Sequence, residues 1–178
     1  MRCFISINVS CDLTQKIHEF EKKLIDDIEF NWVVPENLHL TLKFLSHIKR
    51  DQREALKKTL STIKEAPFSL RLGPLSLFPN SDSPRVLAIN LGGDLERLQA
   101  LKKEVDKHCL ILGVPLEERV FSPHITLARI KKLGEVKKVV PYLNHDFALD
   151  FKVVSFALMS SVLTGEGAHY ELIREFFL

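Results

Sequence analysis

The sequence predicts an α+β protein built from two similar α/β lobes. Strand and helix signals alternate along all 178 residues, and the order of elements in the first half recurs in the second. A His-x-Thr-Leu tetrad occurs in each half, at His39 and at His124, separated by nearly half of the chain. An internal duplication would explain both observations; the alternative is a chance likeness between alternating strands. We therefore expect two lobes related by a pseudo-twofold axis, each an antiparallel sheet with helices on its outer face.

The first half of the chain has the order strand, helix, strand, helix, strand. Cys3–Val9 has strand character, and Asp12 then resembles the N-cap of a helix whose apolar residues recur at helical spacing to Ile28. Residues 38–44 alternate apolar and polar side chains, as a half-buried strand does. A second helix is predicted from Asp51 to Ile63, and a third strand begins at Phe68.

The second half repeats this order. It predicts a strand at 85–91, a helix from Asp94 to Leu112, strands at 124–130, 147–160 and 169–176, and a short helix that begins at Glu135 and ends before Pro141. The Pro- and Ser-rich segment 78–84 is the best boundary between the halves. We expect one domain over 1–178, with lobe 1 at about 1–80 and lobe 2 at about 81–178; strand exchange between the lobes is left open.

Composition excludes several classes of protein. The hydrophobic fraction of 46% and the charged fraction of 27% are those of a globular chain, not of a disordered one. No run of about 18 apolar residues predicts a membrane span, and the N-terminal residues do not resemble a signal peptide. The three cysteines are an odd number without metal-type spacing, which favours a reduced cytoplasmic protein. A net charge of +2 neither requires nor excludes binding to nucleic acid, and a monomer is expected.

The two tetrads concentrate the chemistry. On a strand, residues i and i+2 point the same way, so His39 and Thr41 share one face, as do His124 and Thr126. The apolar residues between them would pack under the helices. A pseudo-twofold axis would place the two His/Thr faces across one central cleft, where two imidazoles and two hydroxyls converge.

Two facing histidines suit acid–base chemistry near neutral pH. With an ordinary pKa of about 6.5, one imidazole can accept a proton while the other donates one. Threonine hydroxyls on rigid strands can bind the oxygens of a tetrahedral anion. A phosphodiester fits this arrangement: one histidine activates the attacking oxygen and the other protonates the leaving oxygen.

Two other interpretations of the tetrads stay open. A single histidine on a strand is more often structural than catalytic, and threonine favours strands in any case; the recurrence of both residues together favours a site. Histidine is also a common metal ligand. A metal site is the weaker interpretation, because neither tetrad contains a carboxylate or thiol to complete the coordination.

These residues carry a family resemblance over essentially the whole chain. The segments Trp32–Leu45 and Ser122–Arg129 resemble the two signatures of the 2H phosphoesterases, in particular the RNA 2′,3′-cyclic phosphodiesterases of bacteria and archaea, historically called 2′-5′ RNA ligases. Arg2–Ile7 and Pro84–Leu87 are also similar to that family. Two His-x-Thr-x tetrads at this spacing are far more specific than one.

The resemblance implies an enzyme that opens the 2′,3′-cyclic phosphate at an RNA end to a 2′-phosphomonoester, without a metal or another cofactor. It implies His39 as proton donor to the leaving 3′ oxygen, His124 as the proton acceptor that activates water, and Thr41 and Thr126 as phosphate-binding residues. The near-symmetry of the tetrads does not itself separate the two histidine roles. Microscopic reversibility would also allow 2′-5′ RNA ligation.

Two arginines are further candidates for substrate binding. Strict alternation places Arg129 on the face opposite His124, unless a bulge or the strand end turns it back toward an anionic substrate. Arg85 begins a strand that could approach the same cleft, although a structural role is the stronger interpretation for it. Phe78 and Trp32 are candidates for stacking on a base.

The substrate expected from the sequence is an RNA end that carries a 2′,3′-cyclic phosphate, or a related cyclic nucleotide. Small cyclic nucleotides, ADP-ribose cyclic phosphate and 2′-5′ oligoadenylates are alternatives within the same phosphate chemistry. A non-catalytic module that binds RNA ends or nucleotides is the alternative outside enzymes. No RNA-binding signature supports base-specific recognition.

Overall fold

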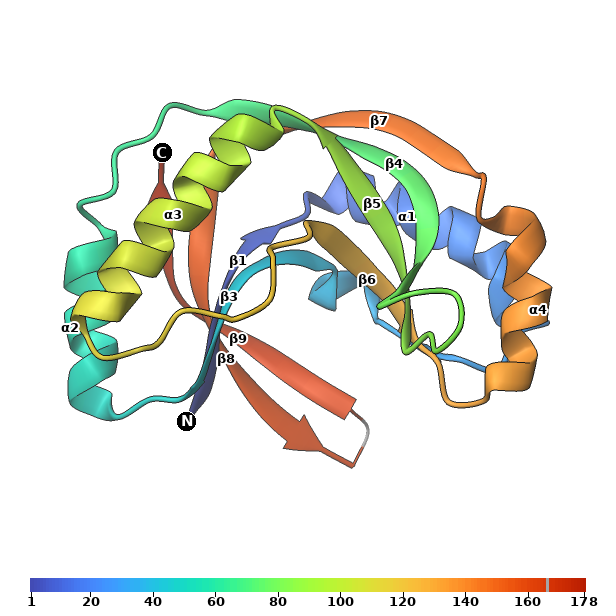
Figure 1. The fold of residues 1–178 in the computed structure, drawn as a ribbon, viewed down its shortest axis with the longest axis horizontal. Helices are drawn as coiled ribbons and strands as arrows, with labels where there is room; N and C mark the ends of the chain where they lie inside the picture. Colours follow the sequence, from blue (N-terminus) through green and yellow to red (C-terminus); the bar gives the residue numbers. More distant parts are fainter. Residues whose placement is uncertain (166) are drawn as a thin grey trace.

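The computed structural model describes residues 1–165 and 167–178, in which the strands form one curled antiparallel sheet (Figure 1). The strands follow the order β7-β4-β5-β6-β3-β1-β8-β9, with β2 paired to β6. The expected mixture of helices with an antiparallel sheet is confirmed. In chain order the main elements are β1 (Arg2–Asn8), α1 (Cys11–Ile25), β2 (Asn31–Trp32), the 3₁₀ turn Pro35–Asn37, β3 (His39–His47), α2 (Arg50–Leu60), β4 (Phe68–Phe78), β5 (Val86–Gly93), α3 (Leu95–Ile111), β6 (His124–Arg129), α4 (Val136–Val139), β7 (Asp146–Val153), β8 (Ser155–Thr164) and β9 (Gly167–Phe177).

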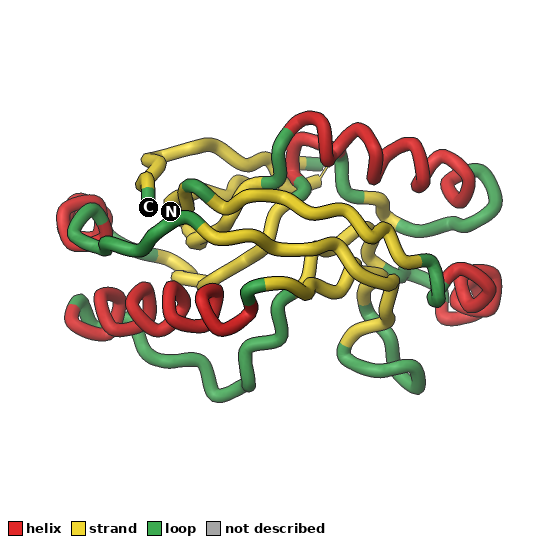
Figure 2. Tube along the Cα trace, turned by 90° about the horizontal axis from the view of Figure 1, so that it is seen from above, coloured by secondary structure: helices red, strands yellow, loops and turns green. Residues whose placement is uncertain are grey.

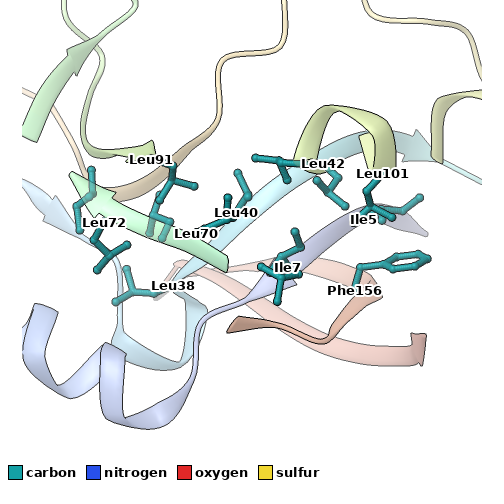
Figure 3. Packing of buried hydrophobic residues seen from close by; sticks show 14 of the residues in the cluster. Ile5, Ile7, Leu38, Leu40, Leu42, Leu70, Leu72, Leu91, Leu101 and Phe156 are labelled. Carbon is teal, nitrogen blue, oxygen red and sulfur yellow. The ribbon is translucent and has the colours of Figure 1, made fainter. Parts of the chain in front are cut away.

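The halves of the chain exchange segments within this sheet. Strand β4, from the first half, pairs with β5 and β7, whereas β8, from the second half, pairs with β1. Helix α3 likewise crosses over and contacts β3, and Figure 3 shows its Leu101 beside Ile5 and Leu42. The division into lobes at residue 80 stays a prediction, and the sheet order indicates that neither half of the chain builds its region of the sheet alone.

One continuous strand expected at 147–160 is two strands. Strand β7 ends at Val153 and β8 begins at Ser155; β7 lies at the edge beside β4, while β8 pairs with β1 on the other side of the molecule. In β7 the large apolar residues occupy odd positions up to Val153, whereas in β8 the large buried apolar residues occupy even positions from Phe156, so strand character continues while the phase of the alternation shifts. The sequence therefore predicts strand on both sides of the break but not the change of partner.

The structure corrects the predicted starts of the first two helices. Helix α1 begins one residue before Asp12, because the carbonyl of Ser10 accepts the backbone N–H groups of Leu13 at 3.1 Å and Thr14 at 2.9 Å. Helix α2 begins at Arg50 instead of Asp51. The helix predicted from Asp94 is α3, which begins at Leu95 with Asp94 as its N-cap residue, and the carboxylate of Asp94 accepts the N–H of Ser69 at 3.0 Å.

The helices and the sheet enclose one hydrophobic core. Seen from above, helices flank the strands on several sides (Figure 2). Leu38, Leu40 and Leu42 of the β3 segment are buried in this core, so the alternate residues of that segment face the other side of the sheet (Figure 3). Each such leucine contributes about 1.5–3 kcal/mol by leaving water, which fixes the strand's register and therefore its polar face.

Within the described part of the chain, no helix combines the length and the apolar character needed to cross a membrane.

Candidate active site

The two tetrads lie on neighbouring strands in the middle of the sheet. Strands β3 and β6 run antiparallel, and Leu40 pairs with Ile125. In an antiparallel pair this register brings His39 toward Thr126 and Thr41 toward His124. The two tetrads therefore lie side by side, as predicted, because β3 of the first half pairs with β6 of the second.

Both histidines are held in the same way. Nδ1 of His39 lies 2.6 Å from the carbonyl oxygen of Asn37, and Nδ1 of His124 lies 2.8 Å from that of Ser122. A carbonyl can only accept a hydrogen bond, so each Nδ1 carries the proton and donates it. This selects the same tautomer in both rings and leaves each Nε2 for proton transfer.

His39 is the more enclosed of the two imidazoles. Its ring packs against Phe4, with centroids 4.9 Å apart, and against the edge of Tyr170 at 5.4 Å. Its Nε2 is 3.0 Å from the hydroxyl of Thr41, which donates to the neutral ring. Burial lowers the pKa of His39 below the ordinary histidine value, and the positive charge that His124 can carry lowers it further. This coupling disfavours two simultaneous imidazolium ions and favours one acid beside one base.

His124 faces a large pocket. Its ring stacks on Phe78, with centroids 4.4 Å apart and planes inclined by 24°. The pocket encloses about 950 Å³ and is open on one side. Of the four His and Thr residues in the two tetrads, three line the pocket directly, and His39 reaches it through its hydrogen bond to Thr41. The full lining comprises Thr41, Leu42, Phe44, Phe78, Pro79, Ser83, Arg85, Val86, Glu117, Glu118, Arg119, Val120, Phe121, Ser122, His124 and Thr126.

The two candidate arginines differ in position. Arg85 is exposed and lines the pocket, and its backbone N–H donates to the carbonyl of Phe78 at 2.6 Å, which closes the loop between β4 and β5. Strand β6 has a bulge, because Leu87 pairs with Ala128 while Ala88 pairs with Thr126. The bulge buries Ala128 in the core and leaves Arg129 exposed, although Arg129 lies outside the described lining of the pocket.

Of the two candidate stacking residues, the structure brings only Phe78 to the pocket. Trp32 packs against Phe30, and its indole N–H donates to the carbonyl of Ile28 at 3.4 Å. Trp32 is therefore part of the packing around the core.

A wall of the pocket comes from the segment between α3 and β6. Residues 117–122 of this segment line the pocket, and a chain of charges ties the segment to the core. Nζ of Lys102 is 3.2 Å from Glu117 and 2.6 Å from Asp106, and Asp106 is in turn 3.0 Å from Nζ of the fully buried Lys43. Lys102 also lies over the ring of Phe121, 5.7 Å from its centroid. These contacts hold the wall that ends at Ser122, whose carbonyl orients His124.

Sequence reasoning missed this wall. The segment is irregular, so it has no hydrophobic period that would place it in the fold. The alternation gives no signal either, because Lys43 continues the polar positions of His39 and Thr41. Only the bulge in β3 turns Lys43 into the core, where a buried lysine needs an acidic partner.

Among the described residues, no group of three or more His, Cys, Asp and Glu side chains is arranged to hold a metal ion. The polar groups that line the pocket are the imidazole of His124, four hydroxyls (Thr41, Thr126, Ser83 and Ser122), the carboxylates of Glu117 and Glu118, and the guanidinium groups of Arg85 and Arg119.

Comparison with protein families identifies the chain. The model of the 2′-5′ RNA ligase superfamily matches residues 11–164. The chain belongs to this superfamily. The resemblance carried by the two tetrads is thereby confirmed, and the matched region contains both of them.

Curated relatives match over the full length. The chain is 33% identical to the "RNA 2′,3′-cyclic phosphodiesterase" of Aquifex aeolicus, over all of this chain and 97% of that protein. It is 32% identical to the protein of the same name from Methanocaldococcus jannaschii, over 98% of this chain and 99% of the relative.

Solved structures share the fold. The crystal structure of TT0787 of Thermus thermophilus superposes with a TM-score of 0.83 and 30% identity, over all of this chain and 98% of that one. The structure of E. coli LigT complexed with 3′-AMP has a TM-score of 0.82 at 22% identity, over 99% and 97% of the two chains, and this likeness supports the fold alone.

Proposed function

We propose that this protein is an RNA 2′,3′-cyclic phosphodiesterase that opens the cyclic phosphate at an RNA end to a 2′-phosphomonoester. One observation carries the chemistry: two histidines on adjoining strands have the same tautomer, each keeps Nε2 for proton transfer, and Nε2 of His39 lies beside the hydroxyl of Thr41. The full-length relatives with this activity in their names support the choice of substrate.

The reaction divides between the two imidazoles. Nε2 of His124 takes a proton from water, and the water oxygen attacks phosphorus. The bond from phosphorus to the 3′ oxygen breaks, and Nε2 of His39 donates a proton to that oxygen. The 2′ ester bond stays intact, so the product carries a 2′-phosphate and a 3′-hydroxyl. Paired acid–base catalysis of this kind contributes about 10²–10⁴-fold for each group.

The hydroxyls of Thr41 and Thr126 donate to the non-bridging oxygens and stabilise the charge that develops there. The bound anion also acts on His39, because a nearby negative charge favours the imidazolium form. With the substrate bound, His39 therefore takes up a proton from solvent and holds it for the leaving 3′ oxygen. Arg85 adds a positive charge at the pocket, and a role of Arg129 in holding the RNA stays part of the proposal.

The test uses the purified protein in excess chelator with a short RNA that ends in a 2′,3′-cyclic phosphate. The expected product is the 2′-phosphate, identified against authentic 2′- and 3′-phosphate standards and by its sensitivity to phosphatase. Formation of a 3′-phosphate would contradict the assigned leaving oxygen, and loss of activity in chelator would restore a metal site. Turnover of 2′-5′ oligoadenylate or ADP-ribose cyclic phosphate without turnover of the RNA would move the proposal to that substrate.

The proposal includes a cytoplasmic monomer. The three cysteines are free in the structure, which fits a reducing compartment.

A further inference from the structure

The pocket extends well beyond the catalytic groups. Its volume of about 950 Å³ is at the upper end of the range for sites that enclose an entire small ligand, whereas a cyclic phosphate and one ribose are a small part of such a ligand. The space continues from Thr41 along β3 to Phe44 and is closed on the other side by the segment that contains Arg119 and Val120.

Phe44 is unusual for an aromatic residue on a central strand, because 63% of its surface is exposed. A bulge in β3 explains its direction: Ser6 pairs with Thr41 but Ile5 pairs with Lys43, so one extra residue shifts the alternation. Lys43 is thereby turned into the core, and Phe44 is turned to the face of the sheet that carries the tetrads.

Val120 is a second exposed apolar side chain at the same pocket, with 93% of its surface accessible. Large apolar side chains that are exposed together beside a cleft mark a binding surface. The charges around them fit a polyanion: Arg85 and Arg119 line the pocket, and Glu117, one of the two acidic lining residues, is paired with Lys102. The other, Glu118, is exposed to solvent.

We infer that Phe44 and Val120 form a subsite for the nucleoside on the 5′ side of the cyclic-phosphate nucleotide, with Phe44 stacking on its base. The inference rests on the proposed function and deepens it: the enzyme would act on RNA chain ends in preference to mononucleotides. Thr41 and Phe44 pair with Ser6 and Phe4, which are two residues apart on β1. The separation is therefore about 7 Å at 3.4 Å per residue, a distance that one further nucleotide can span. Stacking requires no particular base, so the subsite is tolerant of sequence.

The experiment compares kcat/KM on a dinucleotide that ends in a 2′,3′-cyclic phosphate with kcat/KM on the nucleoside 2′,3′-cyclic phosphate. The wild-type protein is expected to prefer the dinucleotide. Phe44→Ala should reduce the dinucleotide value about tenfold more than the mononucleotide value, within the range for aromatic–base stacking. Phe44→Tyr should keep the preference, because it keeps the aromatic face.

Phe177→Ala is the matched control. Phe177 lies on β9 with 69% of its surface exposed and is outside the described pocket lining, so its loss should leave the dinucleotide preference unchanged. Equal losses on both substrates in Phe44→Ala, or a wild-type protein without preference, would overturn the subsite. A wild-type protein that opens neither substrate would instead overturn the proposed function, and the subsite with it.

Discussion

His39 and His124 occupy equivalent positions in the two tetrads, yet their surroundings differ. Both donate Nδ1–H to the carbonyl oxygen two residues earlier. His39 is enclosed by Phe4 and Tyr170, whereas His124 stacks on Phe78 and lines the open pocket. The two imidazoles therefore share one backbone contact that orients them, and the aromatic residues packed on each ring make their surroundings different.

This asymmetry fits the proposed roles. Water must reach the base, and His124 faces the pocket. The acid should lose its proton only to the leaving oxygen, and Phe4 and Tyr170 cover part of the His39 ring. Because burial lowers the pKa of His39, the free protein holds it neutral at pH 7, and it becomes charged when the anionic substrate arrives. Because His39 is charged only when the substrate is bound, its positive charge does not oppose that of His124 in the empty pocket.

The sharpest way to break the comparison is to remove each imidazole in turn. His39→Ala and His124→Ala should each lower kcat on the cyclic-phosphate RNA by about 10²–10⁴-fold. A phosphodiester with a p-nitrophenyl leaving group then separates the roles, because its departure needs no proton. His39→Ala should recover most of its loss on that substrate and His124→Ala should not.

Rates on both substrates, with circular dichroism to check folding, measure this contrast. If His124→Ala were the variant that recovers, the two roles would be exchanged. If neither variant lost activity on the RNA, the two-histidine mechanism would be wrong.

The threonines offer a smaller test of the same asymmetry. Thr41→Ala and Thr126→Ala should each cost about 2–4 kcal/mol of transition-state stabilisation, as the loss of an oxyanion donor does. Thr41 also donates to Nε2 of His39 at 3.0 Å, so its loss should additionally change the pH–rate profile. Thr126→Ser, which keeps the hydroxyl, is the matched control and should retain most of the activity. Identical profiles in the two alanine variants would mean that Thr41 acts on the phosphate alone.

A third test concerns the wall that supports His124 but not His39. Lys102→Met removes the cation that joins Glu117 to Asp106. Because Glu117 is exposed and Asp106 keeps its contact with Lys43, the expected loss of folding stability is about 1–3 kcal/mol, below that of a fully buried pair. Below its unfolding temperature the variant should show a raised KM, because residues 117–122 line the pocket. The imidazole NMR signals should shift for His124 and stay in place for His39.

Lys107→Met is the control on the same helix, since Lys107 is exposed and pairs with Glu104 at 3.5 Å. Lys102→Met could lower the stability and leave both the KM and the His124 signal unchanged. That result would mean that the charge chain contributes to folding but not to the shape of the pocket.

The face that each His/Thr pair of the candidate site shares could be predicted from the sequence because it depends on local geometry. His39 and Thr41 share a face by the period of a strand, and the buried residues Leu38, Leu40 and Leu42 set which face that is. The position of Arg129 could not be predicted from local sequence, because it depends on a bulge in β6. That bulge arises in the pairing with β5, and the alternation of apolar and polar residues does not reveal it. The break at Val154 and the exchange of β4 and β8 also depend on partners distant in sequence.

The smallest expected effect is a change in the pKa of His39 when its ring is exposed, and it tests directly the difference in burial between the two histidines. Tyr170→Ala should raise the pKa of His39 toward the ordinary value of about 6.5, because desolvation is the main cause of its depression. NMR titration of the imidazole protons, with His39→Ala for assignment, measures the change. Tyr142→Ala removes the chain's other tyrosine, whose aromatic contact is with Phe20, and should leave this titration unchanged.

The same change has a signature in stability. A histidine whose pKa is lowered by folding contributes stability that is present above about pH 6.5 and is lost as the pH falls through the folded value. Tyr170→Ala should therefore weaken the loss of stability between pH 7 and pH 5 relative to Tyr142→Ala, as thermal unfolding at each pH would record. An unchanged His39 titration in Tyr170→Ala would place the cause of the asymmetry with Phe4, which packs on the same ring and is itself buried. Phe4→Leu would then be the variant that moves it.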